Sequence, residues 1–162
     1  TACPEGATGW RRARYAFEAV NHHELALILL GVGIFLISID APNLTGLWTF
    51  VILWLMRQSA KLNIFLGVLN LNENFLPNHL KYLQTYFRRR PMNFLMPISI
   101  LGSFIFVVPL WGGALTSGVL PHEIVSSTIL ATLLSLAILE HILLVLPVQI
   151  EFLWKWGFRH ES

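Results

Sequence analysis

The stretch PHEIVSSTILATLLSLAILEHILLVLP (residues 121–147) decides the fold class, because it is apolar over most of its length. About 20 mostly apolar residues suffice for a helix to cross the hydrocarbon core of a bilayer. Proline at the start of the stretch suits the first turn of a helix. The stretch therefore predicts a transmembrane helix whose second half carries one carboxylate, Glu140, and one histidine, His141.

Three more spans are predicted toward the N-terminus. One covers residues 93–115, with Pro97 in its first turns and a kink at Pro109. Another begins after the turn DAPNLTG (40–46), with Thr45 as its N-cap, and continues into the polar run RQSAKLN (57–63). The apolar run at residues 25–39 is too short to span, so its helix must begin earlier and include His22, His23 and Glu24.

The composition agrees with a membrane protein and excludes several other classes. Of the 162 residues, 55% are hydrophobic and 12% are charged, against about a quarter charged in soluble domains. The net charge of +2 argues against a nucleic-acid partner, and the one cysteine, Cys3, excludes an intramolecular disulfide framework. We predict an all-α integral membrane protein with four transmembrane helices and an amphipathic interfacial helix.

The predicted organisation is a single membrane domain at residues 14–158, with an interfacial connection at residues 70–91. Residues 1–13 form a polar segment typical of a linker or a cut end, and residues 159–162 form a tail. If the four spans alternate, nine of the eleven Lys and Arg residues lie in the two terminal segments and the central connection. The positive-inside rule therefore predicts that both ends of the chain are cytoplasmic.

Arg57 lies within the second predicted span, and it is the residue that costs the most free energy to place in a membrane. Glu140 of the fourth span lies at a similar depth, so a buried Arg57–Glu140 pair is geometrically allowed. The alternative is that Arg57 and Lys61 both extend to the interface as topology anchors. A carboxylate reaches water less easily than these longer side chains, so Glu140 must be paired, protonated or facing a cavity.

Histidine and carboxylate residues recur in the cytoplasmic half of the predicted domain. They are His22, His23, Glu24, Glu73, His79 and His141. Such side chains bind zinc and non-haem iron, and a neutral histidine is also an axial ligand for a tetrapyrrole such as bacteriochlorophyll. No spacing matches an established metal motif, and hydrogen bonding between helices is the alternative.

The connection NLNENFLPNHLKYLQTYFRRRPMNF (70–94) has apolar residues at helical spacing, which predicts an amphipathic helix on the membrane surface. Its basic residues are Lys81, Arg88, Arg89 and Arg90. They either contact anionic lipids or a partner, or act only as a topology signal.

The string MRQSAKLNIFLGVLNLNENFLPNHLKYLQTYFRRRPMNFLMPIS (56–99) closely resembles the signature region of PuhE-type membrane proteins, a family linked to photosynthetic complex assembly in anoxygenic phototrophic bacteria. The segments HELA (23–26), GLWTF (46–50) and LEH (139–141) are similar too. The resemblance implies a location in the bacterial inner, intracytoplasmic membrane. It also implies reaction-centre and core light-harvesting subunits as partners, and it supplies no catalytic residue.

Three functions are compatible with these observations. The first is a non-enzymatic assembly factor that packs against partner helices and docks through the basic connection. The second is a membrane protein, with or without enzymatic activity, that binds a tetrapyrrole or a metal through the histidine and carboxylate residues. The third is a proton-coupled carrier that uses Glu140 and Arg57, which is disfavoured by four spans without a repeat.

Overall fold

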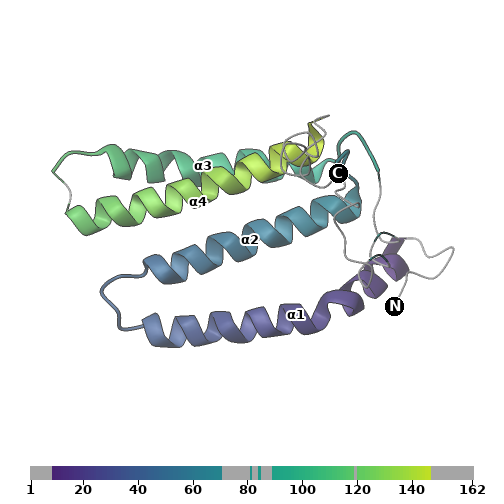
Figure 1. Ribbon diagram of the computed structural model, residues 1–162, viewed down its shortest axis with the longest axis horizontal. Coiled ribbons are helices and arrows are strands. Elements are labelled where there is room, and N and C mark those ends of the chain that lie inside the picture. Colours follow the sequence, from purple (N-terminus) through teal and green to yellow (C-terminus); the bar gives the residue numbers. More distant parts are fainter. Residues whose placement is uncertain (1–8, 71–80, 82–83, 85–88, 119, 147–162) are drawn as a thin grey trace, which may run out of the picture.

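The computed structural model describes residues 9–70, 81, 84, 89–118 and 120–146. Over these residues the chain forms four α-helices: α1 (Gly9–Ser38), α2 (Thr45–Leu66), α3 (Leu95–Leu115) and α4 (Pro121–Val145). Consecutive helices run in opposite directions, so α2 and α4 run the same way (Figure 1). The predicted all-helical fold is confirmed for this part of the chain.

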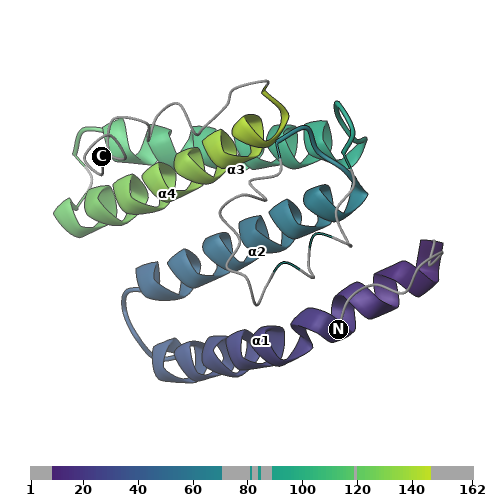
Figure 2. The same ribbon diagram turned by 45° about the vertical axis from the view of Figure 1, so that its right-hand side comes forward.

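The helices lie in an order that makes α2 central. Figures 1 and 2 both show α2 between α1 and the α3–α4 pair. The α3–α4 hairpin has the most extensive contact, α2 packs mainly on α4, and α1 packs mainly on α2. As a result, polar side chains of α2 have neighbours on two sides.

Local sequence signals explain where the helices begin. Pro121 occupies the first turn of α4, and Pro109 lies inside α3, as predicted. Asn93 lies two residues before α3 and stabilises its first turn, because its Oδ1 accepts hydrogen bonds from the backbone N–H groups of Leu95 (2.9 Å) and Met96 (3.1 Å). The prediction of Thr45 as an N-cap is wrong: Thr45 is the first residue of α2, and its N–H donates to Asn43 Oδ1 at 2.8 Å.

Three of the described helices contain segments long and apolar enough to cross a membrane, namely Asn21–Ser38, Leu95–Leu115 and Pro121–Val145. Only 6% of the first segment and 11% of the second is buried. Apolar side chains therefore face outward, as expected for helices surrounded by lipid. The small core lies between α2, α3 and α4, where Val107, Leu134 and Ile138 are buried together.

The remaining predicted span, α2, has the length but not the composition of the other three. Its 22 residues correspond to about 33 Å of helix, yet it is not among the helices apolar enough to span by itself. The polar run at residues 57–63 is the cause. Most of the predicted amphipathic helix falls outside the described residues.

Candidate functional site

The polar run of α2 divides into two sets that point in different directions. Ser59 and Asn63 are four residues apart, and they face α3 and α4. Arg57, Gln58 and Lys61 face α1. Side chains spaced by four residues share a helix face, which places Ser59 with Asn63 and Arg57 with Lys61. Gln58 joins the second set through its contact with Glu24 of α1.

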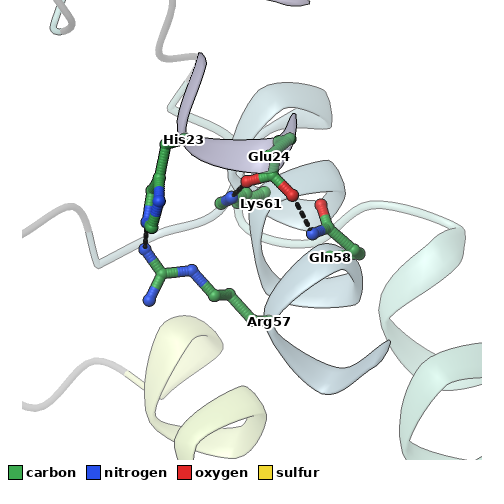
Figure 3. A network of polar contacts seen from close by, with 5 residues as sticks. All are labelled: His23, Glu24, Arg57, Gln58 and Lys61. Carbon is green, nitrogen blue, oxygen red and sulfur yellow. Dashed lines mark hydrogen bonds and ion pairs between the residues drawn. The ribbon is translucent and has the colours of Figure 1, made fainter. Parts of the chain in front are cut away.

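The contacts between α1 and α2 form a network of five side chains (Figure 3). The Glu24 carboxylate lies between Lys61 and Gln58, with one oxygen paired with the Lys61 ammonium and the other accepting from the Gln58 amide. Beside it, Arg57 Nη2 lies 2.9 Å from His23 Nε2. The Glu24 side chain is 11% exposed and that of Lys61 is 31% exposed, so this ion pair is largely shielded.

The Arg57–Glu140 pair predicted from the sequence is not formed. The Arg57 side chain extends toward His23 of α1, and both Arg57 and Glu140 are exposed. A shielded ion pair is formed instead by Lys61 and Glu24. Lys61 pairs with Glu24 because α1 lies beside the face of α2 that carries Lys61.

The contacts among α2, α3 and α4 form a buried polar cluster at a similar level of the bundle. A hydrogen bond of 2.8 Å joins the hydroxyls of Ser59 and Ser99, and Asn63 Nδ2 donates to the Ser59 carbonyl at 2.9 Å and to Ser99 Oγ at 3.2 Å. The fully buried His141 lies on the opposite side of Ser59, with Nε2 2.9 Å from its hydroxyl. One hydroxyl therefore links all three helices.

The ring of His141 has a partner at each nitrogen. Nδ1 lies 2.9 Å from the Ala137 carbonyl, which can only accept, so Nδ1 carries a proton. Nε2 lies 2.9 Å from the Ser59 hydroxyl. A metal or tetrapyrrole could reach this nitrogen only by displacing Ser59.

Those of the predicted histidine and carboxylate residues that the structure describes are not brought together into one site. His23 and Glu24 contact one side of α2, and His141 contacts the other. His22 is exposed on α1. No group of three or more potential metal-ligating side chains is found in the described part of the chain. Glu73, His79 and Arg88 lie outside the described residues, while Lys81, Arg89 and Arg90 are exposed.

The C-terminal end of α2 is held by side chains from other segments. Asn93 Nδ2 donates to the carbonyls of Asn63 (3.1 Å) and Gly67 (2.9 Å). Arg12 donates to the Phe65 carbonyl at 2.9 Å, and its guanidinium lies 4.3 Å from the centre of the Phe65 ring. These contacts add partners to backbone acceptors at the end of the helix, where the Asn63 carbonyl also accepts from the N–H of Gly67 at 2.9 Å.

Sequence reasoning missed Ser59, Asn63, Asn93, Ser99 and Gln58 as members of these networks. Ser59 and Asn63 had a usable signal, because two polar residues four apart within an otherwise apolar span indicate a face turned away from lipid. Asn63 Oδ1 and Trp54 Nε1 are buried atoms that lack a partner among the described residues. Overall, the polar groups of α2 serve mainly contacts between helices, and Ser59 also lines a largely apolar cavity of about 660 Å³ between α2, α3 and α4.

The comparisons identify a family and one relative. A family model described as "Protein of unknown function (DUF3623)" matches residues 1–162. The chain is 37% identical over 158 residues to an uncharacterized 30.4 kDa protein in the puhA 5′ region of Rhodobacter capsulatus. The match covers 95% of this chain and 56% of the relative, so the chain spans just over half of the relative's length. No solved structure matches.

Proposed function

This chain belongs to the DUF3623 family of proteins of unknown function, and we propose that it is a non-enzymatic membrane factor in the assembly of the photosynthetic reaction centre and core light-harvesting complex. In this role it packs against transmembrane helices of the complex. The proposal combines the location of a related gene with the chemistry of the helix surfaces.

The genetic support comes from the Rhodobacter capsulatus relative, which is encoded in the 5′ region of puhA. This region belongs to the photosynthesis genes of a purple bacterium, which suggests a role related to photosynthesis. The resemblance of residues 56–99 to PuhE-type proteins agrees with this context, but neither the family description nor the relative's description includes the name PuhE.

The observation that carries the proposal is the contrast between the inside and the outside of the bundle. Most of the polar run of α2 is engaged by α1, α3 and α4. The outward faces carry large apolar side chains, such as Leu29 of α1 (63% exposed) and Ile105 of α3 (72% exposed). Such surfaces suit lipid or other transmembrane helices, which associate through packing and interhelical hydrogen bonds.

The proposal includes α2 as the fourth span. Lys61 of α2 is paired with Glu24 and largely shielded by α1, which lowers the cost of placing this charge in a bilayer. Arg12 lies in the first turn of α1, and Arg89 and Arg90 lie a few residues before α3. The first turns of α1 and α3 lie at the same end of the bundle (Figure 1). By the positive-inside rule, this is the cytoplasmic side of the inner membrane. Lys81 and the basic run 88–90 then contact anionic lipids or a partner there.

The test is deletion of the gene in its phototrophic host, followed by complementation with the full-length gene. We expect the deletion strain to lose near-infrared absorption of the core complex, and the intact gene to restore it. A variant with Arg88, Arg89 and Arg90 all replaced by Gln should insert into the membrane but restore less of the complex. Wild-type levels of the complex in the deletion strain would refute the proposal. A coloured or metal-loaded purified protein would favour the tetrapyrrole- or metal-binding function.

A further inference from the structure

Two ionisable side chains on the outside of the bundle have no opposite charge beside them among the residues that the structure describes. Arg57 is exposed on α2, and its hydrogen-bond partner is the imidazole of His23. Glu140 is exposed on α4, and it has neither a hydrogen bond nor an ion pair with any described residue. Both lie in the part of the helices that we place in the membrane, where an uncompensated charge is costly.

The two side chains lie at nearly the same depth. The hydrogen bond between Ser59 and His141 sets the level of α2 against that of α4. Arg57 precedes Ser59 by two residues and Glu140 precedes His141 by one, and the two helices run in the same direction. At about 1.5 Å per residue, the depths differ by about 1.5 Å.

They also share a face of the molecule, the one away from α3. On α4, Ser135 contacts Trp111 of α3, and His141 contacts α2. Around the helix, Glu140 and Ser135 lie on opposite sides of His141, so Glu140 lies on the side of α4 away from α3. On α2, Arg57 lies one turn before Lys61, on the side turned from α3.

This face also carries exposed apolar side chains close to the two charges. Leu53 precedes Arg57 by one turn and is 45% exposed, and Leu136 precedes Glu140 by one turn and is 56% exposed. The face therefore combines one cation, one anion and exposed leucine side chains at matching depth.

We infer that two copies of the chain pack against each other through this face, with Arg57 of each copy paired with Glu140 of the other. Copies with the same membrane orientation are related by a two-fold axis along the membrane normal, which preserves depth. Only groups of equal depth can pair across such an axis, and each pair occurs twice. A face with one charge of each sign is complementary to itself. This inference does not depend on the photosynthetic role.

The experiment uses Arg57→Glu and Glu140→Arg in the full-length protein, each with a different tag, in lipid nanodiscs or mild detergent. Each variant alone places like charges at both contacts, so we expect its dimer fraction to fall at least tenfold, measured by light scattering after size exclusion. Coexpression of the two variants creates two correctly signed pairs, so the mixed dimer should copurify at the wild-type level. The doubly exchanged chain should dimerise with itself for the same reason.

The control is Glu123→Arg, which changes an exposed charge at the other end of α4 and should leave the dimer intact. A wild-type protein that is monomeric by light scattering would overturn the inference. So would a mixture that stays monomeric while the doubly exchanged chain recovers wild-type stability, because that result indicates pairing within one chain.

Discussion

The contact between α1 and α2 depends on Glu24, and the change Glu24→Gln tests this. The substitution preserves the size of the side chain but removes the charge that pairs with Lys61. Removing one partner of a fully buried pair costs about 3–5 kcal/mol of unfolding free energy, whereas an exposed pair contributes about 0.2–1 kcal/mol. The Lys61 side chain is 31% exposed and that of Glu24 is 11% exposed. We therefore expect an intermediate loss of about 2 kcal/mol.

The loss should be specific to the unpaired charge. In Glu24→Gln the ammonium of Lys61 remains in a shielded place without its counter-ion, whereas the double variant Glu24→Gln with Lys61→Met removes both charges. We expect the double variant to recover at least half of the lost stability, since replacing both partners by uncharged groups is far less costly than removing one. The coupling between the two sites is then above about 1 kcal/mol.

The assay is equilibrium unfolding of the purified full-length protein in mixed micelles, with SDS as the denaturant and tryptophan fluorescence and circular dichroism as probes. The matched control is Glu18→Gln, which breaks the Arg14–Glu18 pair on the same helix. Its side chains are 74% and 52% exposed, so we expect a change of about 0.5 kcal/mol or less. Equal losses for Glu24→Gln and Glu18→Gln, or strictly additive effects of Glu24→Gln and Lys61→Met, would refute the reasoning.

Three other substitutions test other contacts of the bundle in the same unfolding assay. Gly31→Ala places a methyl group 2.5 Å from the Phe50 ring and should cost about 1–2 kcal/mol, whereas Gly33→Ala meets nothing within 4 Å and should be neutral or stabilising by up to about 1 kcal/mol; equal effects would contradict the α1–α2 packing. Asn93→Ala removes hydrogen bonds to both α2 and the start of α3 and should cost about 2–3 kcal/mol; a loss below about 0.5 kcal/mol would contradict that role. His141→Leu should cost about 1–3 kcal/mol, because two buried acceptor or donor groups lose their partner; an unchanged unfolding midpoint would show that these hydrogen bonds contribute nothing net.

The sequence predicted the class of the fold from composition and run length. The spans now seen as α3 and α4 were located nearly to the residue, because each is a continuous apolar run bounded by a helix start signal and a polar or proline-containing end. The early start of α1, with His22, His23 and Glu24 inside the helix, followed from the shortness of its apolar run. The length of a bilayer-spanning helix is a local property, and a linear sequence reports it directly.

The partners of the charged residues did not follow from the same reasoning. Depth alone favoured Arg57 with Glu140, but an ion pair also requires the two side chains to point toward one another. Depth depends only on the position along one helix, whereas direction depends on which helix lies beside which face. That choice comes from packing between helices, which has no signature in the order of residues.

The amino-acid sequence by itself determined that this protein is helical and apolar enough for a membrane, because hydrophobicity acts residue by residue. The tertiary structure decided that Glu24 pairs with Lys61, that Ser59 links three helices, and that His141 is enclosed. The physical reason is that a polar group in an apolar medium takes whatever partner packing brings within hydrogen-bond distance. Only the arrangement of helices around α2 sets those distances.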